Sequence, residues 1–442
     1  MFRLVLPIAA LLSGVALMLL GLGLLNTLIA IRGGLEGYSD RLIGVIMSGY
    51  FLGFLVGTHI ASPLVRRIGH IRAFAFCAAC LSCIALLHVL FVNPWIWFLL
   101  RVLAGSVIFC LYTIIESWLN GQAPAGSRSQ VFALYMVVNL MAMAAGQQLL
   151  RLDSPMRFTL FAVAAIFISL ALMPVTWTRL VQPSVSEATS LKIGTLARAA
   201  PVAIAGALLA GLTMGAFWGM APVYATDIGL DKAGVAVFMS VAIIGGAVLQ
   251  FPIGRFSDNH DRRQVLAVVG LLAAVSGCAV LALGMLQAQV YAIFAAMFLY
   301  SGFAFAVYPV SVAHLVDHLQ PQDMLSGSSS LLMIYGFGAV LGPAVSGLLM
   351  SKVGTETLPA YFAVMQMVLA LYAYQLGRPI SRYEPQPASF VPMVRTTPTG
   401  LEMMPGGGEE APAAAQPNRT AGEGQDNGPA PIGDNGVQDT CP

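Results

Sequence analysis

Two charged residues, Arg101 and Glu116, lie within one long apolar stretch of the sequence. An ionisable side chain inside a lipid bilayer costs about 2.5–3.5 kcal/mol on insertion scales, so each is a candidate for binding a solute or a proton. Their separation of about 15 residues, at about 1.5 Å each, places them roughly 22 Å apart along a helix. The two side chains therefore cannot form a direct ion pair.

These residues share one helix face with Gly105 and Tyr112, because at about 100° per residue all four fall within roughly 60°. A polar stripe on an otherwise apolar helix is expected to face a water-filled path. We therefore predict that Glu116 is a proton-binding or solute-binding carboxylate. The alternative is a carboxylate at the membrane border that caps its helix or pairs with Arg128.

A second titratable candidate is His314, the rough repeat counterpart of Glu116. Ser311, Asp317 and His318 are its helical neighbours. Histidine titrates near pH 6.5, which suits a proton relay. The alternative is a histidine at a solvated helix end.

Uncharged polar and aromatic side chains in the apolar stretches could line a solute path through hydrogen bonds and stacking. Each could equally serve as an interhelical hydrogen bond or an interface aromatic. The set is Asn26, Tyr50, Asn139, Gln147, Trp218, Tyr224, Gln250, Tyr300 and Tyr335. Tyr112, on the same face as Glu116, is a further candidate for contact with the proton or the solute.

A dense group of charges follows Gly254 and separates two apolar stretches. It contains Arg255, Asp258, Arg262 and Arg263. Asp258 is expected at or near the start of a helix, where the helix dipole favours a carboxylate, and the arginines are close enough to pair with it. We interpret Gly254 together with these four charged residues as a conformational latch on the cytosolic side. The alternative is that the arginines only fix the membrane orientation.

The composition shows what kind of protein must hold these residues. The chain has 442 residues, of which 58% are hydrophobic and 10% charged, whereas soluble domains carry about 25% charged residues. This deficit predicts an all-α membrane protein with many spans. A net charge of +2 indicates no nucleic-acid surface. The first apolar run exceeds the h-region of a secretion signal, so we expect an uncleaved first span.

A membrane span needs about 20 mostly apolar residues, and the sequence predicts twelve. They cover about 4–30, 41–62, 73–92, 95–118, 130–150, 157–178, 200–224, 233–253, 264–287, 289–315, 325–350 and 357–377. The polar stretch of about 179–199 divides them six plus six. We predict an N-terminal six-helix bundle (1–178), a cytosolic linker (179–199), a C-terminal six-helix bundle (200–378) and a disordered tail (379–442), where Pro, Gly and acidic residues accumulate.

Most Arg and Lys fall on one side of this array when the N-terminus is placed inside. The positive-inside rule then predicts a multi-pass protein of the cell (inner) membrane with both termini in the cytosol. A weak repeat relates Gly105 and Tyr112 to Gly302 and Tyr308. Two parallel six-helix repeats with a solute site between them are a recurrent plan among transporters.

Small residues recur at four-residue spacing in two of the predicted spans. One row is Gly49, Gly53 and Gly57, and the other is Gly338, Gly342 and Ser346. Such rows let helix backbones approach closely. They could provide fixed packing, or smooth faces that slide as the two halves move.

Residues of about 4–378 resemble the major facilitator superfamily. The turn from Gly254 to Arg263 is similar to the family's loop signature, and Arg101 to Gly105 matches the R-x-x-x-G of its fourth span. Short motifs such as Glu116-Ser117-Trp118-Leu119 resemble the YcaD-like branch. The resemblance implies the major facilitator fold and a secondary transporter that moves a small organic solute by alternating access, coupled to protons.

The alternative functions are a membrane-embedded enzyme and a sensor without transport activity. An enzyme needs clustered ligands or a nucleophile with its base at a wet interface, and no such spacing occurs in the sequence. We therefore expect no catalytic residues, no metal and no cofactor, and the absence of a Walker loop disfavours ATP-driven transport. The expected partners are a small solute, protons and the lipid bilayer, and the expected state is a monomer. The sequence leaves the solute, the direction of transport and the coupling ion open.

Overall fold

The computed structural model describes residues 2–123, 127–177, 193–320, 323–376 and 397. Its helices are α1 (Phe2–Leu35), α2 (Asp40–Ile68), α3 (His70–Leu90), α4 (Pro94–Gln122), α5 (Arg128–Gln148), η2 (Leu149–Leu152), α6 (Thr159–Leu170), α7 (Leu172–Trp177), α8 (Ile193–Ala199), α9 (Pro201–Asp227), α10 (Lys232–Asp258), α11 (Arg262–Met285), α12 (Val290–Val316), α13 (Met324–Val353) and α14 (Thr357–Gln375). Twelve helical stretches of the described chain are long and apolar enough to cross a membrane. The predicted all-α class with twelve spans is confirmed.

Two helices, α4 and α10, each begin one residue before the predicted span, directly after a polar residue that caps the helix. The Asn93 side chain accepts hydrogen bonds from the backbone N–H groups of Trp95 and Ile96 at 3.0 and 3.3 Å, so α4 begins at Pro94. The Asp231 side chain caps α10 in the same way, through the N–H of Gly234 at 2.8 Å. Hydropathy alone does not register such caps.

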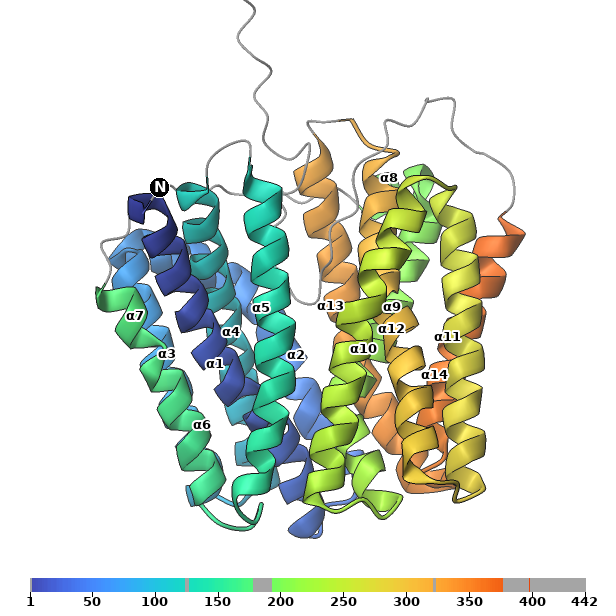
Figure 1. Ribbon diagram of the computed structural model, residues 1–442, viewed down its shortest axis with the longest axis horizontal. Coiled ribbons are helices and arrows are strands. Elements are labelled where there is room, and N and C mark those ends of the chain that lie inside the picture. The colour runs from blue at the N-terminus through green and yellow to red at the C-terminus, as the bar shows by residue number, and fades with distance from the viewer. Residues whose placement is uncertain (1, 124–126, 178–192, 321–322, 377–396, 398–442) are drawn as a thin grey trace, which may run out of the picture. The chain divides into compact units, whose positions relative to one another are not determined.

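The twelve spans run between two ends of the bundle (Figure 1). The Arg-rich end is the one at which α1 begins, at the top of Figure 1, and it carries Arg66, Arg67, Arg72, Arg128, Arg255, Arg262 and Arg263. The far end carries the turns at residues 36–39, 91–93, 153–158, 228–231, 286–289 and 354–356.

The spans form a first group, α1 to α7, and a second group, α9 to α14 (Figure 1). Within the first group α2 packs on α4 and α1 on α5, and within the second α10 packs on α12 and α9 on α13. The groups meet most extensively where α2 packs on α13 and α5 on α10, and α9 also contacts α1 and α2. The domain limits at 178 and 200 stay predictions. Most of the expected linker, and the expected disordered tail apart from Thr397, lie outside the described residues.

Glycine rows hold helices together inside each group. A Cβ atom on Gly53 would lie 1.9 Å from the carbonyl oxygen of Val102, and one on Gly105 would lie 1.9 Å from that of Tyr50, so α2 and α4 meet backbone to backbone. In the second group, Gly338 of α13 meets the backbone of Leu208 on α9 in the same manner. The structure thus assigns these rows to fixed packing within a group. They do not form the faces that we considered as sliding surfaces.

A different pair of glycines brings the two groups together. A Cβ on Gly44 of α2 would lie 2.3 Å from the carbonyl oxygen of Pro343, and one on Gly347 of α13 would lie 2.5 Å from that of Asp40. This seam lies toward the far end, where α2 begins and α13 approaches its last residue. Close approach between the groups therefore depends on glycine at these two positions.

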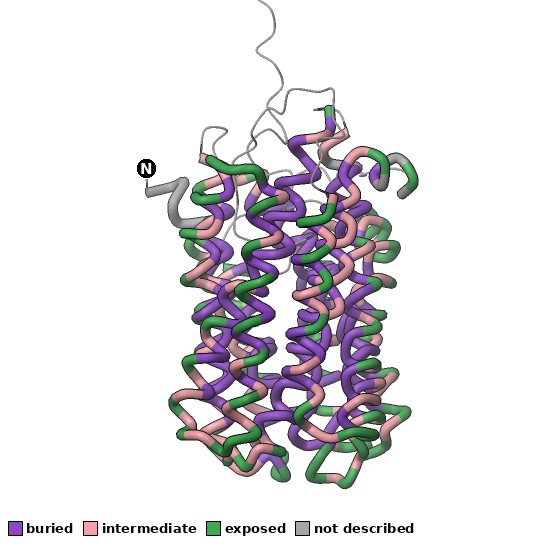
Figure 2. Tube along the Cα trace, turned by 90° about the vertical axis from the view of Figure 1, so that its right-hand side faces the viewer, coloured by how far each residue is buried: buried purple, intermediate pink, exposed green. Residues whose placement is uncertain are grey.

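Large apolar side chains remain exposed on the same spans that carry the buried core residues, and Figure 2 colours both classes along the chain. Exposed examples are Leu99, Val137, Phe251, Val275 and Phe337, each from a different span. Exposed apolar side chains are what a lipid-facing helix presents, since the helix satisfies its own backbone hydrogen bonds.

Candidate functional site

Glu116 is fully buried on α4, three residues before the end of its apolar core at Leu119. Its Oε1 accepts a hydrogen bond of 3.3 Å from the hydroxyl of Tyr135 on α5. Its Oε2 accepts two hydrogen bonds from Thr397, at 2.8 Å from the backbone N–H and at 2.6 Å from Oγ1. The carboxylate therefore connects α4, α5 and a residue 281 positions away in the sequence.

Tyr112 lies one helical turn before Glu116 on α4, and it is also buried. Its ring packs edge-on against Phe54 of α2, with the ring centres 6.5 Å apart. The predicted polar face of α4 is thus turned inward, toward α2 and α5. Both residues are buried between helices of the first group, and the expectation that this face lines a water-filled path stays a prediction.

Arg101 is buried near the start of α4 and brings a second pair of predicted residues together. Its Nη1 donates a hydrogen bond of 2.8 Å to Oδ1 of Asn26 on α1. Its guanidinium carbon lies 4.5 Å from the centre of the Tyr50 ring on α2, in a cation–π arrangement. Three helices of the first group therefore converge on one guanidinium.

Gln147 and Asn139 are both buried on α5. Oε1 of Gln147 accepts a hydrogen bond of 2.6 Å from the hydroxyl of Thr27, and its Nε2 donates one of 3.0 Å to the carbonyl oxygen of Gly23. Both partners lie on α1, so this side chain fastens α5 to α1. Asn139 lies one turn beyond Tyr135, on the stretch of α5 that faces Glu116.

His314 lies at the Arg-rich end of α12, within the second group. Its ring is inclined at 68° to that of His318, with ring centres 4.7 Å apart, and its carbonyl oxygen contacts Nδ1 of His318 at 2.8 Å. The predicted proton relay stays a prediction.

The predicted latch forms an ion-pair network inside the second group. Nη2 of Arg262 lies 3.2 Å from Oδ1 of Asp258, and Nε of the same residue lies 3.0 Å from Oδ2 of Asp317 on α12. Arg263 pairs with Asp261 at 3.2 Å and donates from Nη1 to the carbonyl oxygen of Leu376 at 2.8 Å. These contacts join α10, α11, α12 and the end of α14.

Gly254 and Arg255 complete the predicted latch on the last turns of α10. Gly254 is buried, whereas the Arg255 side chain is exposed and its carbonyl oxygen accepts a hydrogen bond of 3.3 Å from Asn259. Asp258 is the last residue of α10 rather than the first of α11, whose start is capped by Asp261 through the N–H of Arg263. The role of a latch stays a prediction.

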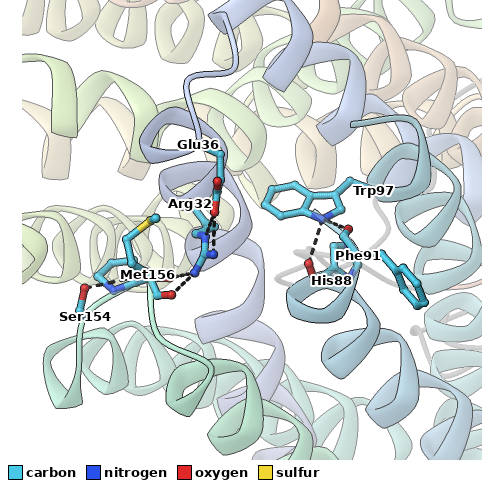
Figure 3. A network of polar contacts seen from close by, with 8 residues as sticks. Arg32, Glu36, His88, Phe91, Trp97, Ser154 and Met156 are labelled. Carbon is cyan, nitrogen blue, oxygen red and sulfur yellow. Dashed lines mark hydrogen bonds and ion pairs between the residues drawn. The ribbon is translucent and has the colours of Figure 1, made fainter. Parts of the chain in front are cut away.

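A clamp at the far end was not anticipated from the sequence (Figure 3). Arg32, at the end of α1, pairs with Glu36 at 2.6 Å and donates to the carbonyl oxygens of Pro155 and Met156. Trp97 donates to the carbonyl oxygens of His88 and Phe91, each at 2.9 Å, and so secures the turn between α3 and α4.

Hydrogen bonds at the far end also cross from α5 to α10. Nε2 of Gln148 donates to Oγ of Ser240 at 2.7 Å, and that hydroxyl donates to the carbonyl oxygen of Ala144 at 2.7 Å. Nζ of Lys232 donates to the carbonyl oxygen of Asp153 at 2.9 Å. A hydrogen bond from Thr159 holds the pKa of the Asp153 carboxyl below its ordinary value. The two groups are thus joined beside the loop that Arg32 clamps.

Two residues beside Glu116 were missed as site residues. Tyr135 shares a face of α5 with Asn139, four residues on, and this spacing was an available signal. Thr397 carries no such signal, because its segment reads as a polar, Pro-rich tail.

The chain is similar to known membrane transporters in sequence and in fold. The model of the Major Facilitator Superfamily matches residues 203–405. An uncharacterized MFS-type transporter YcaD of Shigella flexneri is 28% identical over 393 residues, which cover 87% of this chain and 98% of that protein. Among solved structures, a mutant of the nucleoside transporter NupG aligns with a TM-score of 0.69 and 15% identity, over 84% of this chain and 98% of that one.

A bacterial homologue of the human lysosomal transporter Spinster, in an inward-facing and unoccupied conformation, aligns with a TM-score of 0.68 and 14% identity. The alignment covers 84% of this chain and 95% of that chain. At these identities the two structural likenesses show the fold alone.

Proposed function

Because the chain belongs to the major facilitator superfamily, we propose that it is a proton-coupled secondary transporter of a small organic solute, which works by alternating access between the first and the second group of spans. It is an MFS-type transporter, so the alternatives of an embedded enzyme or a sensor are set aside. The observation that carries the proposal is Glu116, a fully buried carboxylate that accepts hydrogen bonds from Tyr135 and Thr397.

A buried carboxylate can couple the transport of a proton to the transport of a solute, because its charge changes when it gains or loses a proton. A buried charge is costly inside the bilayer, so binding of a proton and binding of a solute to the same carboxylate affect each other. Tyr135, a neutral hydroxyl donor, can stay in place in both protonation states. We assign proton and solute binding to Glu116, with Tyr112 and Asn139 beside it, and solute positioning to Arg101 with Asn26. Gln147 supports the α1–α5 contact of this site, and His314 is a second proton-binding candidate.

The Arg-rich end supports the proposal that this end faces the cytosol, since cytosolic loops carry the excess of Arg and Lys. Both termini would then be cytosolic, in a monomer of the cell (inner) membrane. The contacts of Gln148 with Ser240 and of Lys232 with Asp153 join the two groups and support a state that is closed at the far end. In alternating access, these contacts would break as the far end opens, and the network of Gly254, Arg255, Asp258, Arg262 and Arg263 would act as the latch at the other end.

The test measures solute-dependent proton movement in proteoliposomes that contain a trapped pH-sensitive dye. The probes are single nucleosides, sugars and amino acids, beginning with uridine because one structural neighbour is named a nucleoside transporter. With a responding probe, Glu116→Gln is expected to abolish the solute-dependent proton flux, because a glutamine side chain cannot gain or lose a proton in this pH range. The control Glu356→Gln, at an exposed far-end position, should transport normally. Unchanged proton coupling in Glu116→Gln would contradict the proposal.

A further inference from the structure

Thr397 is completely buried, although its segment reads from the sequence as part of a polar tail. Its backbone N–H and its hydroxyl both donate to Oε2 of Glu116, at 2.8 and 2.6 Å. Hydrogen bonds to a carboxylate are stronger than those between neutral groups. The contact therefore occupies the same carboxylate to which we assign solute binding.

The two hydrogen-bond donors of Thr397 are attached to adjacent carbon atoms, the nitrogen to Cα and Oγ1 to Cβ. Both donate to the same oxygen of Glu116. The other oxygen of Glu116 accepts from Tyr135. The site is thus arranged for a close pair of donors at Oε2, while Tyr135 orients the carboxylate from the other side.

We propose that Glu116 binds solutes that carry two hydrogen-bond donors on adjacent carbon atoms, and that Thr397 occupies this position when no solute is bound. The inference rests on the proposed function of Glu116 and names the class of its ligand. Vicinal diols of sugars and polyols carry such a pair, and so do N-acylated amino alcohols such as threonine within a peptide. Because Thr397 belongs to the same chain, it competes at a high effective concentration and lowers the apparent affinity for the solute.

The first experiment measures how accessible Glu116 is in the purified full-length protein. Dicyclohexylcarbodiimide adds to a protonated carboxyl group, and the adduct rearranges to an N-acylurea that retains all atoms of both reactants. Mass spectrometry of the peptide that contains Glu116 gives the rate. Thr397→Val removes the hydroxyl donor, and Thr397→Pro removes the hydroxyl and the N–H.

We expect the labelling rate to rise from the parent to Thr397→Val and again to Thr397→Pro. Loss of one hydrogen bond to a charged group corresponds to about a tenfold change in occupancy. Thr399→Val, a matched change two residues away, should label at the parental rate. A Thr397→Pro protein that labels at the parental rate would overturn the proposal, as would an equal increase in Thr399→Val.

The second experiment identifies the ligand class by protection of Glu116 in the Thr397→Pro protein. N-acetyl-threonine amide is compared with N-acetyl-valine amide, which has a methyl group in place of the hydroxyl. A vicinal cyclohexanediol is compared with its isomer whose hydroxyls are one carbon farther apart. Protection by the threonine compound alone indicates a peptide-type solute, and protection by the vicinal diol indicates a polyol. Equal labelling with all four compounds would overturn the assignment of the ligand class.

These measurements do not depend on transport. If Glu116→Gln still couples protons to transport, the proposed function fails and the labelling result stands. If Thr397→Pro labels like the parent protein, the present proposal fails and the proposed function stands.

Discussion

Nη1 of Arg101 donates a hydrogen bond of 2.8 Å to Oδ1 of Asn26, while its guanidinium group stacks over the ring of Tyr50 at 4.5 Å. The three residues come from α4, α1 and α2. A planar guanidinium can make both contacts at once, since its edge donates and its face stacks. Arg101 therefore holds three helices in one arrangement as well as being a candidate for contact with solute.

Replacing Arg101 by lysine is expected to lower the free energy of unfolding by about 1.5–3 kcal/mol, the range for a hydrogen bond to a charged group. The lysine keeps the charge but loses the planar fork. Thermal melting in detergent measures the effect. Arg157→Lys is the matched control, because this side chain is 72% exposed and should change stability by less than about 0.5 kcal/mol. Equal melting temperatures for Arg101→Lys and the control would contradict the prediction.

Gly53→Ala is expected to destabilise the protein by about 1–3 kcal/mol or more, because the added methyl group would overlap the carbonyl oxygen of Val102. Gly34→Ala, on α1, adds the same methyl group with no atom within 4 Å. This control should be neutral or slightly stabilising, by about 0.5–1 kcal/mol, because alanine favours the helix. Melting temperatures and purified yields distinguish the two. Similar losses in both variants would show that glycine packing between α2 and α4 is not the cause.

Gly44→Val is expected to open the far end by separating α2 from α13, because its side chain would meet the Pro343 carbonyl. The change destabilises only the closed state, so it shifts the conformational population. The reporter is an introduced Ala236→Cys in a background without other cysteines, because Ala236 is buried and only its carbonyl oxygen contacts Gln148. Its labelling by a membrane-impermeant maleimide should accelerate about tenfold if the closed state loses about 1.4 kcal/mol relative to the open one. Gly34→Ala in the same background should leave the rate unchanged. A Gly44→Val protein that labels no faster would count against the far-end seam.

Asp317→Asn is expected to destabilise the protein more than Asp258→Asn. Both carboxylates pair with Arg262, whose side chain is 3% exposed, but Asp317 is 10% exposed and Asp258 is 34% exposed. Removing one partner of a buried pair costs about 3–5 kcal/mol, whereas an exposed pair contributes about 1 kcal/mol or less. Thermal melting of the two variants gives the order, and the reverse order would refute it.

The number and positions of the spans follow from the sequence because hydropathy is a local property. Twelve apolar runs of sufficient length give twelve membrane-crossing helical stretches among the described residues. Helix ends are less predictable, since α4 begins where the side chain of Asn93 caps it. The sixth span divides into α6 and α7, which hydropathy does not indicate.

The contacts of the candidate site depend on tertiary packing, and residue spacing alone does not provide them. Periodicity placed Arg101 and Glu116 on one face, but it gave neither Asn26 nor Tyr135 as a partner. A row of glycines predicts that a backbone approaches closely without saying which one. For Gly53 the neighbour is α4 of its own group, whereas for Gly44 it is α13 of the other.

The backbone contact at Gly53 also makes α2 and α4 a single mechanical element. One arm of this element carries Glu116, and the other carries Gly44 at the seam with α13. Main-chain atoms in direct contact cannot absorb a displacement as flexible side chains can. A ligand that tilts α4 at Glu116 is therefore expected to move α2 with it, and so to change the contact of α2 with α13 at Gly44.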